Sequence, residues 1–396
     1  MDIFFNTLIN FIFIAWSYII LFHGRFFLSK ESFFWSNKII LEKKFPLNSF
    51  NKNKKFKKTS VIVPARNEEK NIAKCIEGLI NQKDYIEEII IIDDDSYDKT
   101  RKVAKQAFLK YKFQNFKIIP SKSLPIDWNG KTWALNQGKD IALKNKKTEY
   151  LLFVDADIFL ENDVICIVQN VLKEKKLDMI SLMAKLNCTS FWEKLLIPSF
   201  IFFFQKLYPF NQVNKNNSKI SAAAGGFIFC NKKIFLNENL FEKIRDKIID
   251  DCNLAKAIKQ KGSIWLGLTN KVKSIRIYES LQQIWLMVSR TAYEQLNCSL
   301  KNLFISILGM IFLYQLAPFY IFSNQLIFNQ QLNLTLYLIY LLPTIIFLPT
   351  IKFYNLSFIY VFLLPISSFL YILMTMNSAY NFYFKKGNVW KNRKYK

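Results

Sequence analysis

Acidic residues that stand close together are the first feature of this sequence that could do chemistry. The stretch YLLFVDADIFL, residues 150–160, runs from apolar residues directly into Asp155 and Asp157. Side chains two positions apart on an extended strand point to the same face, so the spacing predicts that both carboxylates are presented together. Carboxylates this close repel each other unless a cation or several hydrogen-bond donors lie between them. The alternative is an Asp-rich turn with solvated carboxylates.

Two further acidic groups have a similar setting. Residues 93–95 follow a run of four isoleucines, and Asp250 and Asp251 open an apolar-periodic segment that ends at Gly262. Acids at the start of a helix also suit the helix dipole, which is the structural alternative for Asp250 and Asp251. Histidine is the most frequent proton acceptor in catalysis, but the sequence contains only His23. Any base would therefore have to be a carboxylate.

The segments around these acids alternate between strand and helix patterns. Strand patterns, which are short and rich in β-branched residues, cover residues 59–64, 87–96, 116–120 and 150–154. A helix pattern covers 67–82, with Asn67 as its cap and acids suited to its dipole, and a second helix begins at Asp98. For Asp95 and Asp98 we expect only a turn or capping role. The alternation predicts a parallel sheet covered on both faces, with ligands beyond the carboxyl ends of its strands.

Long apolar segments lie on both sides of this domain. Of the 396 residues 16% are aromatic and 39 are Phe, which argues against a wholly soluble protein. Residues 3–22 form an apolar run long enough to cross a bilayer, and no small-residue cleavage site follows it, so we expect a retained anchor. Three more segments of spanning length occupy 303–322, 332–349 and 356–376. Pro343 and Pro349 make the middle one the least secure.

These segments divide the chain into five expected parts. They are a membrane anchor (1–28), a basic juxtamembrane linker (29–58), the sheet domain (59–298), C-terminal transmembrane helices (299–380) and a basic tail (381–396). Within the sheet domain, residues 195–210 are apolar but too short to span. We expect this segment to lie at the bilayer interface, and burial in the core of the domain is the alternative.

The formal net charge is +25, but the basic residues do not gather with stacking aromatics as a nucleic-acid-binding module would require. They concentrate beside the apolar segments, at 52–58 and 385–396, which is typical of the cytoplasmic face of a membrane. We therefore expect a multi-pass protein of the cytoplasmic membrane whose sheet domain faces the cytosol. Three full C-terminal crossings would put the tail on the opposite side, so one of them is expected to be re-entrant or interfacial. The six cysteines form no CxxC pair, which suits a reducing compartment.

Five motifs occur in order along the sheet domain. They are VIVPARNEE (61–69), IIDDDSYDKT (91–100), GKTWALNQG (130–138), VDAD (154–157) and IIDDCNLAKAIKQKG (248–262). In this order and approximate spacing they resemble glycosyltransferase family 2, inverting enzymes whose α/β GT-A fold is Rossmann-like with a mainly parallel mixed sheet. The stretches LPIDWNGKTWALNQG, FIFFFQKLYPF and VSRTAYEQL are similar to hopanoid-associated glycosyltransferases, relatives of carotenoid and ceramide glycosyltransferases.

The resemblance implies a nucleotide-sugar site at the ends of the first two strands. Asp93 or Asp94 would accept hydrogen bonds from the base or ribose. The backbone of Pro64 and Ala65 and the side chain of Glu68 would assist. The donor implied is a UDP-hexose, and the acceptor is a membrane lipid of the hopanoid, carotenoid or sphingolipid kind.

The resemblance also implies the catalytic groups. Asp155 and Asp157 would hold Mg²⁺ or Mn²⁺ against the diphosphate, with Asp157 as the direct ligand, because hard cations take oxygen ligands. Lys131 could reach a phosphate, and a solvated lysine is its alternative. Asp251 would be the base that takes the proton from the acceptor hydroxyl. The glycine-containing stretch 222–227 would let backbone approach the sugar, or it serves tight packing.

One departure from the family pattern limits the reaction. Arg290 stands where the arginine of the Gln-x-x-Arg-Trp element would steady the diphosphate, but Thr291 replaces the tryptophan. That tryptophan helps to bind a growing glycan, so its replacement favours transfer of a single sugar over processive polysaccharide synthesis. The alternative from another class is a membrane scaffold that keeps the fold without turnover.

Overall fold

The computed structural model describes residues 2–24, 26–27, 58–323, 334–384, 388–390 and 393–395. Two compact units divide the chain. The sheet unit comprises Ser36–Asn187 and Gln212–Arg276, and the helical unit comprises Met1–Trp35, Cys188–Asn211 and Ile277–Lys396. The expected basic linker, except Lys58, lies outside the described residues, as do residues 385–387, 391–392 and 396 of the expected basic tail.

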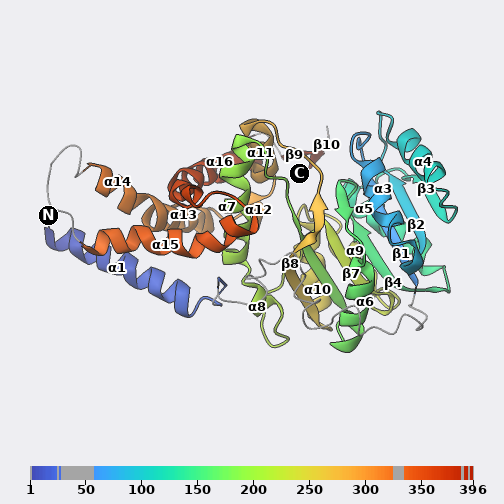
Figure 1. The fold of residues 1–396 in the computed structure, drawn as a ribbon, viewed down its shortest axis with the longest axis horizontal. Coiled ribbons are helices and arrows are strands. Elements are labelled where there is room, and N and C mark those ends of the chain that lie inside the picture. The colour runs from blue at the N-terminus through green and yellow to red at the C-terminus, as the bar shows by residue number, and fades with distance from the viewer. Residues whose placement is uncertain are drawn as a thin grey trace. The chain divides into compact units, whose positions relative to one another are not determined.

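An eight-stranded mixed sheet forms the centre of the sheet unit (Figure 1). Its strands are β1 (Lys58–Ala65), β2 (Ile86–Asp93), β3 (Phe116–Pro120), β4 (Thr148–Val154), β5 (Ile158–Leu160), β6 (Met179–Lys185), β7 (Phe227–Asn231) and β8 (Ile264–Ser274). Their spatial order is β3-β2-β1-β4-β7-β6-β8-β5. The first four are mutually parallel, whereas β7 and β5 run antiparallel to their neighbours. The expected mainly parallel mixed sheet is confirmed.

Helices pack on both faces of this sheet. They are α3 (Ile72–Ile80), α4 (Thr100–Lys110), α5 (Gly130–Leu143), α6 (Val164–Glu174), α9 (Leu240–Lys243) and α10 (Asp250–Lys259), with short 3₁₀ turns η2 (Lys83–Tyr85) and η3 (Lys232–Phe235). Alternate residues of β1 point to opposite faces. Val61 and Val63 share one core with α3, α4 and α6. Ile62 faces α5, where a Cβ on Gly138 would lie 2.4 Å from its Cγ2, so only glycine lets the helix approach this closely.

The helix expected over 67–82 begins later than the sequence predicted. α3 starts at Ile72, with Asn71 as its cap, and Asn67 has a left-handed backbone with φ of 51°. The Glu68 carbonyl accepts from the N–H groups of Asn71 and Ile72 in a turn that precedes the helix. The prediction was wrong because the apolar period begins only at Ile72, and the acids before it form a loop.

Of the turn or capping role expected for Asp98, the structure shows the turn, while the cap position of α4 is Lys99. Asp98 Oδ1 accepts a hydrogen bond from the Thr100 backbone N–H at 2.9 Å, where α4 begins.

The helical unit contains three helices of membrane-spanning length within the described part of the chain: Leu300–Ser323, Leu334–Phe353 and Phe358–Phe384. The first combines α13 (Leu300–Met310), the π-helical turn η4 (Ile311–Gln315) and α14 (Leu316–Ser323), the second is α15 (Leu334–Phe353), and the third combines η6 (Phe358–Leu363) and α16 (Leu364–Phe384). α15 continues through both of its prolines. The expected C-terminal membrane helices are confirmed by length and composition.

The N-terminal helix α1 (Asp2–Leu21) runs beside α15 (Figure 1). Its apolar part, as far as the side chains are described, is Thr7–Leu21, which is shorter than the C-terminal helices. The remaining elements of the chain are α7 (Phe191–Leu207), α8 (Phe210–Val213), α11 (Leu281–Ser289), α12 (Ala292–Gln295) and the short antiparallel strands β9 (Asn388–Trp390) and β10 (Arg393–Tyr395).

The expected interfacial segment 195–210 falls mainly in α7, which belongs to the helical unit rather than to the sheet unit. Leu196 and Phe202 are fully buried. The Leu196 carbonyl accepts a hydrogen bond from Tyr371 Oη of α16 at 3.0 Å. The compact units therefore differ from the expected boundaries. Residues 188–211 and 277–298 pack with the apolar helices because their own apolar faces need partners.

Candidate active site

The buried acids of β2 lie at the carboxyl end of the sheet. Asp93, the last residue of β2, pairs with Ala65 of β1 in the ladder, next to Pro64. The Asp94 N–H donates to the Ala65 carbonyl at 2.7 Å. Asp93 Oδ2 accepts from Arg101 Nε at 2.6 Å, while its buried Oδ1 has no hydrogen-bond partner among the described residues. Four of the five residues expected here, all but Glu68, are thus brought together, and one carboxylate oxygen of Asp93 has no partner among the described residues and could accept a bond from a ligand.

Lys131, near the start of α5, connects carboxylates from two other elements. Its Nζ lies 2.9 Å from Oδ1 of Asp155, which follows β4, and 3.5 Å from Oδ2 of Asp250, which begins α10. The alternative of a solvated lysine is wrong, since the side chain is 24% exposed and bridges two acids. These residues, together with Asp251, form what we call the lysine cluster.

Asp251 is held by backbone donors on both of its oxygens. Oδ2 accepts from the Gly225 N–H at 2.7 Å, and Oδ1 accepts from the Cys252 N–H at 2.7 Å. A Cβ on Gly225 would lie 3.1 Å from Lys131 Nζ and 3.3 Å from Asp251 Oδ2. Glycine at this position therefore lets the backbone reach the lysine cluster, which is the packing role considered for 222–227. Approach of a sugar stays a prediction.

The electrostatics of the lysine cluster favour a proton acceptor at Asp251. Burial raises its pKa, the neighbouring Asp250 raises it further, Lys131 opposes both, and the result is a pKa of about 6. Burial also raises the pKa of Asp155, against the opposing effect of Lys131. Burial alone would lower the pKa of Lys131, but the charges of Asp155 and Asp250 outweigh it and the net shift is upward. Asp251 is thus ionised at neutral pH and more basic than an ordinary carboxylate.

Asp157 has different partners from Asp155. Its Oδ2 accepts from Arg276 Nε at 2.7 Å, and Arg276 Nη2 contacts Glu68 Oε1 at 2.5 Å. We call Glu68, Asp157 and Arg276 the arginine cluster. The prediction that Asp155 and Asp157 share a strand face was wrong, because β4 ends at Val154 and a turn follows. Arg276 was missed, since it belongs to no motif and lies far along the chain.

The residues present fit a divalent cation that arrives with a diphosphate. Within the described part of the chain, no group of three or more His, Cys, Asp or Glu side chains is arranged to hold a metal ion. Mg²⁺ is usually held by one or two carboxylates together with substrate phosphates. Asp155 Oδ2 and Asp157 Oδ1 take part in none of the ion pairs described above, so each carboxylate offers one oxygen. Their role as ligands stays a prediction.

Arg290 lies in the helical unit, at the end of α11. Its predicted contact with the diphosphate concerns the other unit and stays a prediction.

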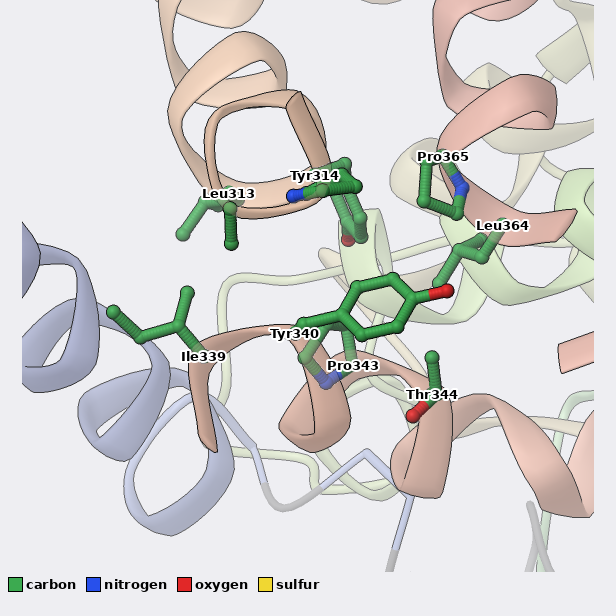
Figure 2. A pocket seen from close by; sticks show the side chains of 10 residues that line it. Leu313, Tyr314, Ile339, Tyr340, Pro343, Thr344, Leu364 and Pro365 are labelled. Carbon is green, nitrogen blue, oxygen red and sulfur yellow. The ribbon is translucent and has the colours of Figure 1, made fainter. Parts of the chain in front are cut away.

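A small pocket lies within the helical unit, where side chains converge from η4 and α14, α15, and the η6–α16 segment (Figure 2). Its lining comprises Leu313, Tyr314, Ala317, Pro318, Ile339, Tyr340, Pro343, Thr344, Leu364 and Pro365. None of these side chains is acidic or basic, so the pocket offers no charged group to a nucleotide diphosphate.

The comparison with protein families finds a match for a segment that runs from β1 to just past η3. Residues 60–237 match the model of glycosyl transferase family 2, and the matched segment contains the strand ends, Lys131 and both acids after β4. The domain defined by this fold and site is of the glycosyltransferase class. The chain carries a glycosyl transferase family 2 domain.

Similar curated proteins share only a part of this chain. A dolichyl N-acetyl-alpha-D-glucosaminyl phosphate 3-beta-D-2,3-diacetamido-2,3-dideoxy-beta-D-glucuronosyltransferase of Methanococcus voltae is 36% identical over 26% of this chain and 30% of its own length. A 4,4'-diaponeurosporenoate glycosyltransferase of Staphylococcus haemolyticus is 35% identical over 30% of this chain and 29% of its own length. A cholesterol galactosyltransferase of Borreliella burgdorferi is 28% identical over 31% of this chain and 31% of its own length. The chain therefore spans less than a third of the length of these relatives.

Solved structures are also similar. Glucosyl-3-phosphoglycerate synthase from Mycobacterium tuberculosis is 15% identical with a TM-score of 0.41, and the match covers 61% of this chain and 79% of that one.

Proposed function

We propose that this protein transfers one sugar, with inversion, from a nucleotide-sugar to a hydroxyl group of a membrane lipid. The observation that carries the proposal is the lysine cluster, in which the basic carboxylate of Asp251 lies beside a lysine that also binds Asp155. Two of its residues, Lys131 and Asp155, lie within the segment 60–237 that matches the model of glycosyl transferase family 2, and Asp250 and Asp251 follow that segment. The donor proposed is a UDP-hexose, and its nucleoside would bind between Pro64, Ala65 and the acids that end β2.

In the proposed reaction, Asp251 accepts the proton of the lipid hydroxyl as the oxygen attacks the anomeric carbon. The bond from that carbon to the diphosphate oxygen breaks, and the nucleoside diphosphate leaves from the opposite face. Lys131 donates to a phosphate oxygen of the leaving group. A bound Mg²⁺ or Mn²⁺, held by Asp155 and Asp157, would neutralise charge on that diphosphate.

A lipid acceptor is supported by two features. Three helices of membrane-spanning length follow the sheet unit among the described residues, and relatives of the domain carry names of enzymes that act on a carotenoid and on cholesterol. We propose a multi-pass protein of the cytoplasmic membrane, with its basic segments and sheet unit on the cytosolic side. A hopanoid, carotenoid or sphingolipid-like molecule is the acceptor class proposed.

The test is transfer by the purified full-length protein in detergent. It would be supplied with radiolabelled UDP-glucose, Mg²⁺ and a lipid extract, and the products separated and weighed by mass spectrometry. The expected product exceeds one lipid of the extract by a single hexose. A ladder of longer products would support a polysaccharide synthase instead, and no turnover of any nucleotide-sugar offered would support a scaffold.

A further inference from the structure

The arginine cluster joins three segments, which follow β1, β4 and β8, through the side chain of Arg276. Arg276 Nε donates to Asp157 Oδ2 at 2.7 Å, and Nη2 contacts Glu68 Oε1 at 2.5 Å. The side chains of Glu68 and Asp157 are only 7% and 15% exposed. Charge-assisted bonds of this length are strong and directional, so one guanidinium fixes two carboxylates relative to each other.

The backbone around the arginine cluster is fixed independently of it. Ile158 of β5 pairs with Ser274 of β8, and the Ile275 N–H donates to the Asp157 carbonyl at 2.9 Å. These backbone bonds place Asp157 and Arg276 side by side without any contribution from their side chains.

Glu68 is anchored in the same way. Its own N–H donates to Thr100 Oγ1 at 2.7 Å, and its Oε2 accepts from Asn71 Nδ2 at 2.8 Å. Arg276 therefore links two rigid positions rather than two mobile loops.

The geometry leaves Asp157 with one oxygen bound and one available. Oδ2 is taken by Arg276, while Oδ1 forms no ion pair or hydrogen bond with another described residue. A carboxylate held in this way has a fixed orientation, as is common for ligating carboxylates whose second oxygen is hydrogen-bonded.

We propose that Arg276 is a positioning residue that orients Asp157 toward the divalent cation of the donor complex, and that Glu68 acts through Arg276 rather than on the nucleotide. This inference rests on the proposed function, since it concerns the metal and nucleotide of that reaction. It changes the role expected for Glu68 from the sequence. It also assigns a role to a residue outside the family motifs.

The test measures Mn²⁺ binding, by electron paramagnetic resonance, to the full-length protein in detergent with UDP present. Loss of a residue that orients a metal ligand typically weakens metal affinity by about 10–100-fold, and this loss is expected for Arg276→Gln. Arg276→Lys should restore binding only in part, because an ammonium cannot hold two carboxylates in one planar fork. Glu68→Gln should weaken Mn²⁺ binding as well, and the double variant should be no worse than Arg276→Gln alone, because both changes remove the same link.

The matched control is Lys273→Gln, which removes a basic residue of β8, three positions before Arg276, from an exposed pair with Glu161. It should leave Mn²⁺ binding unchanged. If Arg276→Gln binds Mn²⁺ as tightly as the parent and only its melting temperature falls, Arg276 forms a purely structural ion pair and the inference is overturned. Tighter Mn²⁺ binding by Arg276→Gln would also overturn it, because Arg276 would then compete with the metal for Asp157. If the two changes weaken binding additively, Glu68 acts separately and the inference also fails. A parent protein that binds no Mn²⁺ with UDP would end both this inference and the proposed metal-dependent reaction.

Discussion

Replacement of Asp251 by Asn tests the base directly. The variant keeps the size of the side chain but has no carboxylate to take the acceptor's proton. Only one of its two terminal atoms can accept from the N–H groups of Gly225 and Cys252, which now donate to both oxygens at 2.7 Å. Positioned proton acceptors contribute about 10²–10⁴-fold to rate, so the turnover number should fall by this factor, which corresponds to about 3–5 kcal/mol of barrier. Donor binding should change little, because Lys131 still pairs with Asp155.

The pH profile gives a second, independent readout for Asp251. Its pKa of about 6 is raised above the ordinary value, so the base is lost as pH falls through that value. At pH 5 only about a tenth of the molecules would carry the ionised base. The kcat/KM of the parent should therefore fall on the acid side with a midpoint near 6. Asp250→Asn should move this midpoint to lower pH, because the charge of Asp250 raises the pKa of Asp251.

The assay is sugar transfer from labelled donor to lipid, measured from pH 5 upward with saturating donor. Asp246→Asn is the control for an exposed acid of the same unit, and it should behave as the parent does. A turnover number for Asp251→Asn equal to that of the parent, or an unchanged acid limb in that variant, would refute the reasoning.

Three further predictions concern the metal, the glycine and the helical unit. Removal of divalent cations by EDTA should abolish transfer, and Mg²⁺ or Mn²⁺ should restore it; full activity in EDTA would exclude a metal role. Gly225→Ala should lower the turnover number at least tenfold with little change in melting temperature, since its Cβ would meet Lys131 and Asp251 at 3.1 and 3.3 Å; parent-like transfer would contradict this. Glu193→Gln should destabilise the protein by about 1.5–3 kcal/mol, because the buried carboxylate accepts from several donors including the Tyr278 N–H. Burial opposes the ionised form of Glu193, but these hydrogen bonds outweigh it and lower the pKa of the carboxyl group. The stability that they provide is therefore present at neutral pH and is lost as pH falls through the folded-state pKa. Thermal unfolding at several pH values measures this loss, and equal melting temperatures for the variant and the parent would refute the prediction.

Local pattern predicted four of the eight strands of the sheet unit. Short apolar runs located β1, β2, β3 and β4, and acids marked the ends of β2 and β4, because buried strands and the loops after them differ sharply in polarity. The lysine cluster assembles residues of three separate motifs at one edge of the sheet, which the topology of a parallel sheet implies. The partners within that edge could not be predicted. Arg276 lies 119 positions from Asp157, and nothing in its neighbourhood distinguishes it from other basic residues.

Errors arose where a segment's structure depends on distant partners. The same-face prediction for Asp155 and Asp157 assumed an extended strand, but the ladder between β4 and β7 ends at Val154. The segment around Leu196 was too short to span a bilayer, and its helical partner near Tyr371 lies 175 positions away. Length and composition alone cannot show such a pairing.

The placement of α7 with the apolar helices has a consequence for synthesis of the chain. This helix leaves the ribosome long before α16, whose Ser367 and Tyr371 hydrogen-bond to carbonyls of Leu195 and Leu196. Until α16 is synthesised, the apolar face of α7 lacks this partner, so contacts distant in sequence limit the rate of folding. A fragment truncated after residue 276 would keep α7 but lose α16, which leaves the apolar face of α7 exposed to water. Such a fragment should therefore aggregate unless α7 is replaced by a short polar loop.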